Sequence, residues 1–221
     1  MQRGRVIVFE GLDYTGKTTQ SNNLHNYLNK HGQISKLFKF PTYDSPTGQV
    51  LKQYHTAKIE CPSHVSHLLH SANRFEFDES IKNNINNGIH VIIDRFNFSG
   101  LAYSYALMKT RGSQEPDYEW LQHTDRGLVR SDIVIYLNVP LDQLEKRRFK
   151  SETLLERYEN NEMQKYVSQG YKIIASNNKD IWYDIDANHN ADHVFSTILN
   201  LITRKFTEPL KALEILGQHG P

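Results

Sequence analysis

The stretch from Val6 to Gln20 constrains the fold of this chain more than any other. Its residues 11–18 read Gly-Leu-Asp-Tyr-Thr-Gly-Lys-Thr and match the phosphate-binding loop pattern G-x4-G-K-[S/T]. Glycines let the backbone N–H groups of such a loop turn inward onto an anion, and the following helix adds the positive end of its dipole. Val6 to Phe9 is typical of a buried parallel strand, and Thr18 to Lys30 is typical of a helix. The stretch therefore predicts a strand, a phosphate-binding loop and a helix.

Two side chains of this loop, Lys17 and Thr18, are expected to contact the nucleotide and its metal ion directly. We expect Lys17 to reach the β- and γ-phosphates of a nucleoside triphosphate and the Thr18 hydroxyl to ligate Mg²⁺. Contacts to ATP are expected along the loop and the start of the helix, from Gly11, Leu12, Asp13, Tyr14, Thr15, Gly16, Lys17, Thr18 and Thr19.

Asp13 is the anomaly of the loop, because a carboxylate close to phosphates is repelled by several kcal/mol in a partly dry site. We expect its side chain to point away from the phosphates, toward a neutral hydroxyl or an arginine. The alternative is a carboxylate that only caps the turn.

Length and composition narrow the class of protein. A chain of 221 residues suits one α/β domain, here residues 1–221, with a small lid. With a formal charge of +1, nothing in the overall composition favours nucleic acid or an acidic membrane as a partner, and we expect neither. Cys61 is the only cysteine, which excludes an intramolecular disulfide and suits a reducing compartment. The chain has no apolar run near the ~18 residues of a membrane span, and its start leaves no room for a cleaved signal. We expect a soluble cytoplasmic protein, with the nucleus as a second compatible compartment.

The pattern along the chain alternates strands and helices. Strands are expected over 6–9, 34–40, 89–94, 133–139 and 181–185. Helices are expected over 18–30, 48–54, 62–88 as one long helix, 96–108, 118–123, 141–148, 160–175 and 191–205. This alternation predicts a doubly wound, five-stranded parallel sheet flanked by helices, of the P-loop NTPase type.

The strand over 89–94 ends in a carboxylate, Asp94, which is followed directly by Arg95. An apolar strand ending in Asp downstream of a phosphate loop is typical of a Walker B element, so Asp94 is expected beside Mg²⁺ together with Thr18. Arg95 can grip a phosphate with two hydrogen bonds. Arg74, on the preceding helix, could supply a second phosphate or base contact. The alternative for Arg74 is a surface salt bridge with Glu76 or Glu79.

A basic segment follows the fourth strand and includes Lys146-Arg147-Arg148, Lys150 and Arg157. In a phosphoryl-transfer enzyme such a segment would be a lid, here about residues 146–160, whose arginine neutralises the transferring group. The alternative is a solvated helix face.

His64, His67 and His70 recur every three residues on one helix. No cysteine or carboxylate completes a tetrahedral zinc site with them. We therefore expect two ordinary helix-face histidines, His64 and His67, and one pocket residue, His70.

Four segments together resemble the thymidylate kinases, and they are Phe9–Gln20, Leu68–Glu76, Asp94–Tyr103 and Glu156–Asn160. The loop alone would suit many NTPases, but Asp-Arg-aromatic followed by Ser-Gly-x-Ala-Tyr is far narrower. The resemblance runs from Val6 to about Gln169 and more loosely to the end. It implies Mg²⁺-dependent transfer of the γ-phosphoryl group of ATP to dTMP, in dTTP biosynthesis. It also implies a homodimer whose interface includes the helix near Arg74.

The resemblance also implies roles for individual residues. Asp13 would accept a hydrogen bond from the 3′-OH, Arg95 would grip the dTMP phosphate, and Arg74 would bond a thymine carbonyl. The remaining implied contacts are Phe40 and His70 flanking thymine, Ser99 and Gly100 lining the base pocket, Tyr103 crowding C2′, and Tyr158 and Gln164 on the lid side. Arg147 or Arg148 would lie under the adenine or reach the phosphates. The catalytic set implied is Lys17, Asp13, Arg95, Arg147 and Arg148.

Three positions depart from the family pattern. Tyr14 stands where a basic residue often follows the loop Asp, so the catalytic cation is expected in the lid. Tyr43 stands where an Arg usually meets the monophosphate, and His70 where a Phe usually stacks on thymine. Because of these departures, an alternative remains: a kinase of the same fold that phosphorylates another acceptor or a broader range of acceptors, such as dUMP, dGMP or a deoxynucleoside. A non-enzymatic P-loop switch is less favoured, because the chain has no guanine-reading N-K-x-D motif.

Overall fold

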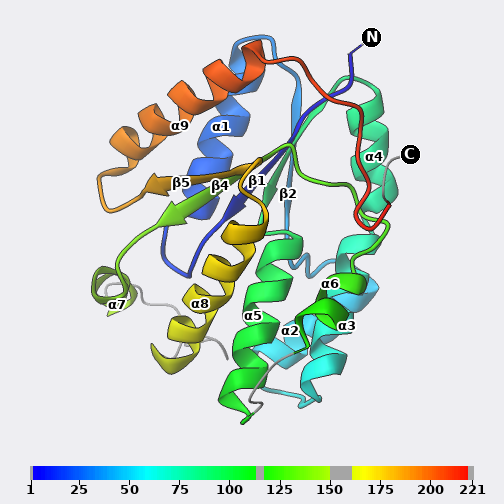
Figure 1. Ribbon diagram of the computed structural model, residues 1–221, viewed down its shortest axis with the longest axis vertical. Coiled ribbons are helices and arrows are strands. Elements are labelled where there is room, and N and C mark those ends of the chain that lie inside the picture. Colours follow the sequence, from blue (N-terminus) through cyan, green and yellow to red (C-terminus); the bar gives the residue numbers. More distant parts are fainter. Residues whose placement is uncertain (1, 113–116, 150–160, 219–221) are drawn as a thin grey trace.

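The computed structural model describes residues 2–112, 117–149 and 161–218, and it contains a five-stranded sheet in which every pairing is parallel (Figure 1). The strands are β1 Val6–Glu10, β2 Ser35–Lys39, β3 His90–Asp94, β4 Ile133–Asn138 and β5 Trp182–Asp186. Their order across the sheet is β2-β3-β1-β4-β5. The predicted doubly wound sheet and its five strands are confirmed, and no strand end is shifted by more than one residue.

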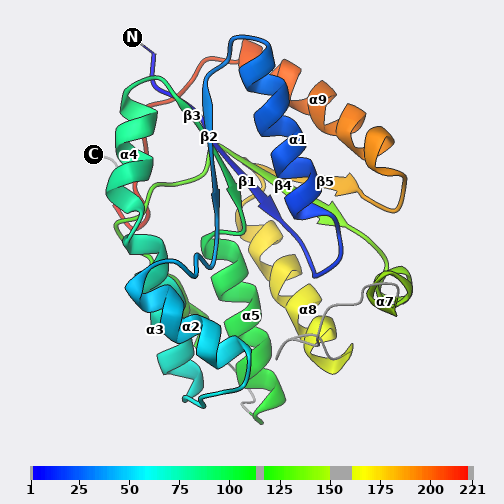
Figure 2. The same cartoon turned by 180° about the vertical axis from the view of Figure 1, so that it is seen from behind.

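Helices cover both faces of this sheet, as the two opposite views show (Figures 1 and 2). They are α1 Lys17–Lys30, α2 Pro46–His55, α3 Ser63–Phe75, α4 Asp78–Asn86, α5 Asn97–Thr110, α6 Tyr118–His123, α7 Leu141–Phe149, α8 Asn161–Asn177 and α9 Ala191–Thr207. Helices α1 and α9 lie together, and α5 packs along α8.

The strand register divides the buried side chains between two faces. Val8 of β1 lies opposite Ile93 of β3 and Val134 of β4, so these side chains share one face. On that face, Val8 and Ile93 form a core cluster with Ile81 and Ile85 of α4. On the other face, Ile7 and Phe9 belong to the larger cluster that includes α1 and α9. Since every strand runs the same way, the loops after β1, β2, β3 and β4 meet at one edge of the sheet.

The prediction of one helix over residues 62–88 is wrong, because the chain bends between α3 and α4. The Phe77 N–H bonds the carbonyl of Arg74, three residues back, and so tightens the last turn of α3. Glu76 is held sideways by Thr47, whose N–H and hydroxyl both donate to its carboxylate. Phe77 packs edge-on against Phe40. These tertiary contacts outweigh the continuous helical spacing of the sequence.

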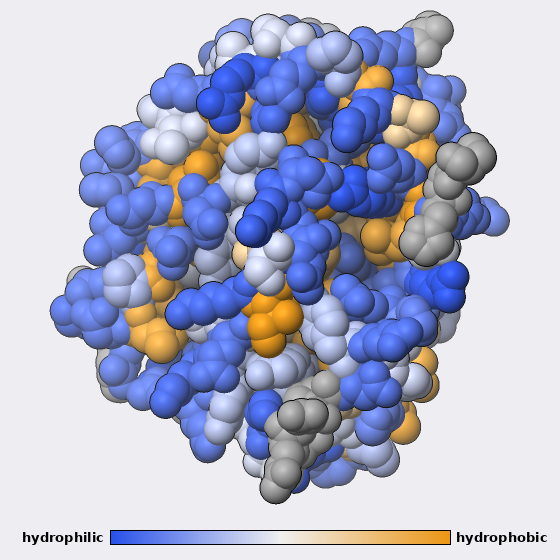
Figure 3. Space-filling model, in the orientation of Figure 1, coloured by the Kyte–Doolittle hydropathy of each residue, from blue (hydrophilic) through white to orange (hydrophobic). Residues whose placement is uncertain are grey.

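The tail after α9 folds back onto the body of the protein. Val129 and Ile215 form an antiparallel bridge, and the N–H of Arg130 bonds the carbonyl of Glu214. The face in Figure 3 is dominated by hydrophilic side chains, with apolar side chains in separate patches. Among the helices of the described ranges, none is both long and apolar enough to span a bilayer.

Candidate active site

The phosphate loop connects the carboxyl end of β1 to the first turn of α1 and has an unusual backbone. Gly16 and Tyr14 have φ angles of 95° and 64°, values in the left-handed region that turn N–H groups toward a common centre. A Cβ on Gly11 would lie 2.8 Å from the carbonyl oxygen of Leu137 on β4, so close packing against the sheet excludes a side chain there.

Lys17 folds back over this loop, and its ammonium donates to the carbonyl of Leu12 and, at 3.4 Å, to the hydroxyl of Thr15. Burial, and then the positive charge of Arg95, lowers the pKa of Lys17 to about 7. An anion in the loop would offset both effects. The loop thus holds a buried cation without enough negative charge around it, which suits it to receive phosphates.

Thr18 and Asp94 meet beside the loop, as predicted from the Walker B pattern. The Thr18 hydroxyl donates to Asp94 Oδ2 at 2.6 Å. The other carboxylate oxygen, Oδ1, is buried and makes no hydrogen bond within the described residues. A buried anionic oxygen without a donor costs free energy. A hydroxyl and a carboxylate in this arrangement are oxygen ligands of the kind that Mg²⁺ prefers.

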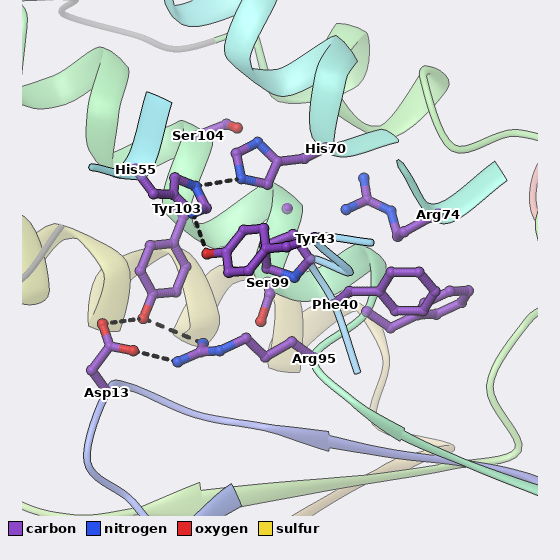
Figure 4. A pocket seen from close by; sticks show the side chains of 13 residues that line it. Asp13, Phe40, Tyr43, His55, His70, Arg74, Arg95, Ser99, Tyr103 and Ser104 are labelled. Carbon is purple, nitrogen blue, oxygen red and sulfur yellow. Dashed lines mark hydrogen bonds and ion pairs between the residues drawn. The ribbon is translucent and has the colours of Figure 1, made fainter. Parts of the chain in front are cut away.

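A separate cavity lies next to the loop, with about 740 Å³ of empty space when the part open to solvent is included. Its lining contains nearly all the predicted acceptor residues, namely Asp13, Phe40, Tyr43, His70, Arg74, Arg95, Ser99, Gly100 and Tyr103 (Figure 4). The lining also contains His55, which the sequence analysis did not identify. The site therefore has two parts, a loop for phosphates and a pocket beside it.

Asp13 points away from the phosphate loop into this pocket, as the repulsion argument predicts. Arg95 pairs with its Oδ1, and its Oδ2 accepts from the Tyr103 hydroxyl at 2.8 Å and from Gln164 Nε2 at 2.9 Å. Burial opposes ionisation, but Arg95 and Lys17 outweigh it, so the pKa of Asp13 lies below its ordinary value. Burial also raises the pKa of Tyr103. At neutral pH the pocket therefore holds an ionised Asp13 and a protonated Tyr103.

Arg95 has a left-handed backbone, with φ of 67°, and a buried carboxylate fixes the chain that follows it. Glu10, fully buried at the end of β1, accepts from the N–H groups of Phe96 and Ser99, both at 3.0 Å. The hydroxyls of Ser99 and Tyr171 also donate to it, at 2.5 and 2.9 Å. Glu10 thus anchors the start of α5 and the arginine just before it. This role of Glu10 was not predicted, although a carboxylate that ends an apolar strand was a usable signal.

Arg74 reaches the pocket from α3 as part of a buried ion pair. Its guanidinium bonds both carboxylate oxygens of Asp125 at 2.8 Å, and each of the two side chains is 3% exposed. The alternative of a surface salt bridge with Glu76 or Glu79 is therefore wrong. A Cβ on Gly100 would lie 2.8 Å from this guanidinium. The small residue predicted for the base pocket thus makes room for Arg74.

The histidines of α3 are only partly as predicted. His70 lines the pocket, and His64 is exposed on the helix surface beside Trp120. His67 is fully buried and bonds the hydroxyl of Ser104 at 2.7 Å, so its assignment as a helix-face residue is wrong. Within the ranges that the structure describes, no group of three or more His, Cys, Asp or Glu side chains could hold a metal ion.

Two arginines at the start of the predicted lid occupy different places. Arg147 donates to the carbonyls of Tyr14 and Ala187, at 3.2 and 2.8 Å. Arg148 lines a second cavity together with Asp13, Tyr14 and Gln164. Arg148 is thus the arginine that faces the gap beside the loop. The predicted lid residues Lys150, Arg157 and Tyr158 lie outside the described residues.

Comparisons with known proteins agree on one family. The family model described as thymidylate kinase matches residues 9–198. Thymidylate kinase from Plasmodium falciparum is 36% identical over 208 residues, which is 94% of each chain. The human thymidylate kinase is 32% identical over 197 residues, 89% of each chain. A solved structure of thymidylate kinase from Candida albicans superposes with a TM-score of 0.84 at 29% identity, and the match covers 97% of this chain and 98% of that one.

Proposed function

This chain belongs to the thymidylate kinase family, and from that premise we propose that it transfers the γ-phosphoryl group of ATP to dTMP. The observation that carries the proposal is the pairing of the phosphate loop with a second pocket that holds Asp13, Arg74 and Arg95. A hydrolase or a switch needs only the loop. A transferase also needs a place for the acceptor.

In the proposed reaction an oxygen of the dTMP phosphate attacks the γ-phosphorus of ATP. The bond from that phosphorus to the β–γ bridging oxygen breaks, and ADP leaves with that oxygen. Little covalent chemistry falls to the protein, so it acts through positioning and electrostatics. The loop amides and Lys17 hold the donor phosphates, and Arg95 orients the acceptor phosphate.

Mg²⁺ fits the site formed by Thr18 and Asp94, because Asp94 Oδ1 is buried without a hydrogen-bond donor in the described part of the chain. When bound, the ion would neutralise the phosphates and help to orient them. Thr18 and Asp94 hold each other in place at 2.6 Å before it binds.

The acceptor pocket suits a deoxynucleoside monophosphate. Asp13 is ionised and accepts hydrogen bonds, which fits a contact to a sugar hydroxyl. Tyr103 fills the space beside it and would crowd a 2′-hydroxyl. Phe40 and His70 line the base end of the pocket, where Arg74 supplies a donor.

An acceptor panel tests this function directly. With ATP and Mg²⁺, dTMP is expected among the best acceptors when dTMP, dUMP, dCMP, dGMP and their ribose counterparts are compared by ADP release. The solved Candida albicans enzyme is described as having broad substrate specificity. If dTMP were not among the best acceptors, the proposed specificity would be refuted while a kinase remained, whereas rapid ATP hydrolysis without any acceptor would favour an NTPase.

Arg148 is the proposed additional cation for the transition state, because Tyr14 stands where a basic residue often follows the loop Asp. We expect Arg148→Ala to lower kcat on the order of 100-fold, the usual scale for removing one charge-stabilising donor. Arg147→Ala should lower kcat by less than ~10-fold, since Arg147 bonds the backbone carbonyls of Tyr14 in the loop and of Ala187 after β5. Steady-state kinetics at saturating ATP and dTMP checks both, with Lys146→Ala, an exposed cation of the same helix, as control. A larger loss of kcat for Arg147→Ala would contradict the assignment.

The proposed state is a cytoplasmic homodimer that pairs through α3. Val65, Leu68 and Phe75 are 43%, 48% and 39% exposed and recur along one side of this helix. Large apolar side chains exposed in a row are typical of an interface. We expect the protein to sediment as a dimer and Leu68→Glu to sediment as a monomer. Ile34→Glu, at an exposed apolar residue just before β2, is the matched control. A wild-type monomer at micromolar concentration would refute this state.

A further inference from the structure

A chain of hydrogen bonds links three ring side chains that line the acceptor pocket (Figure 4). The Tyr43 hydroxyl lies 2.8 Å from His55 Nδ1, and His55 Nε2 lies 3.1 Å from His70 Nε2. The chain ends at His70 Nδ1, which lies 2.7 Å from the carbonyl oxygen of Ser66. It therefore connects the loop after β2, the end of α2 and the middle of α3.

The carbonyl of Ser66 fixes the direction of every bond in this chain. A carbonyl oxygen only accepts, so His70 Nδ1 carries the hydrogen. Burial, with the positive charge of Arg74, lowers the pKa of His70 to about 3, so the ring is neutral at physiological pH and its Nε2 has only a lone pair. His55 Nε2 must then donate to His70. In a neutral His55 ring, Nδ1 is the acceptor, and it receives the single hydroxyl hydrogen of Tyr43.

These directions decide what each ring can offer to a ligand. Both nitrogens of His70 are engaged, one with Ser66 and one with His55, so a ligand meets the face of a neutral aromatic ring. The only hydroxyl hydrogen of Tyr43 goes to His55, so toward a ligand this oxygen acts as an acceptor. A phosphate binds through hydrogen-bond donors. Since Tyr43 offers none, Arg95 must bind the acceptor phosphate.

We infer that His55 is a positioning residue of the acceptor site, which holds His70 as a flat, neutral surface for a nucleobase and turns the Tyr43 hydroxyl away from phosphate. This inference rests on the proposed function, since it assigns the planar ligand to the acceptor nucleotide. Of the three rings linked by hydrogen bonds, His55 is the central one, and it alone bonds both of the others. It is 7% exposed, so water competes little for its nitrogens.

Kinetics of His55→Leu test the inference. The variant removes the donor to His70, and we expect the KM for dTMP to rise ~10-fold, the scale of one buried polar group left without its partner. The KM for ATP should stay within ~2-fold. The double variant His55→Leu/His70→Phe should return the KM for dTMP to within ~3-fold of wild type, because a phenyl face needs no hydrogen bond to hold it neutral. A merely structural defect would not be rescued by this second change.

His31→Leu is the matched control, because His31, like His70, bonds through Nδ1 to a backbone carbonyl four residues earlier. Its Nδ1 lies 2.7 Å from the carbonyl of Tyr27, four residues back, but it stands after the far end of α1. Its replacement should leave the KM for dTMP unchanged. If His55→Leu turned over dTMP with an unchanged KM, or the double variant were no better than the single one, the inference would be overturned.

The tautomers can be read in the wild-type protein without any substrate. In two-bond ¹H–¹⁵N spectra at pH 7, His70 is expected as the Nδ1–H form and His55 as the Nε2–H form. An Nε2–H form or a charged ring at His70 would overturn the inference. Absence of dTMP turnover by the wild type would instead refute the proposed function, and the tautomers would still report on the hydrogen-bond chain.

Discussion

Lys17→Ala is expected to lower kcat by about 1,000-fold or more while the fold remains intact. The ammonium is buried in the phosphate loop and bonds the carbonyl oxygen of Leu12 and the hydroxyl of Thr15. It is therefore available to the β- and γ-phosphates, whose developing charge it would stabilise in a site with little water. A coupled assay of ADP release gives the rate, and circular dichroism reports the fold. Lys30→Ala, at the exposed end of the same helix, is the control. Turnover within threefold of wild type would refute the assignment of this loop as the binding site for the ATP phosphates.

The same substitution should move stability in the opposite direction to activity. The pKa of Lys17 falls from 10.5 to about 7 on folding because burial penalises its charge. Between these two values the unfolded chain binds more protons than the folded one, so this group makes the nucleotide-free protein more stable as pH rises from 7 toward 10.5. Lys17→Ala should flatten that rise in thermal melts and should not lower Tm at pH 7. A large drop in Tm would mean that Lys17 supports the fold itself.

The sheet could be predicted from the sequence because its strands are short apolar runs separated by helical patterns. The orientation of Asp13 could also be predicted, since Coulomb repulsion from phosphate leaves it one direction to point. Both conclusions depend on local features of the chain. Local features were also enough to predict the phosphate-loop pattern, the proximity of Thr18 and Asp94, and most of the residues that line the pocket beside the loop.

The remaining features depend on contacts between distant segments. His55 ends α2 without any motif, and its bond to His70 arises only because α2 packs on α3. Asp125 is 51 residues from Arg74 in the sequence. No local sequence feature could therefore predict that Arg74 pairs with Asp125 and not with Glu76. The bend between α3 and α4 likewise comes from Thr47 and not from a helix-breaking residue nearby. In each case a tertiary contact decided among alternatives that were locally equivalent.

Arg95→Ala is expected to lower kcat/KM for dTMP by about 100- to 10,000-fold. Two charge-assisted hydrogen bonds to a phosphate are worth about 1.5–3 kcal/mol each, and Tyr43 cannot replace them because its hydrogen goes to His55. The loss should fall on the acceptor, so the KM for ATP should change less than ~3-fold. Asp13 would keep its bonds from Tyr103 and Gln164, and the pocket should remain formed.

Arg130 offers a matched control for Arg95, because it pairs with Asp180 and Glu214 at the opposite edge of the sheet. Arg130→Ala removes an equally charged and partly buried guanidinium, so it controls for the general cost of losing an ion pair. It should leave both KM values unchanged. Isothermal titration of dTMP into each variant separates binding from turnover, and Arg95→Ala should show weakened dTMP binding without ATP present. Wild-type affinity for dTMP in that titration would mean that Arg95 serves only to hold Asp13, and that the acceptor phosphate is bound by another cation.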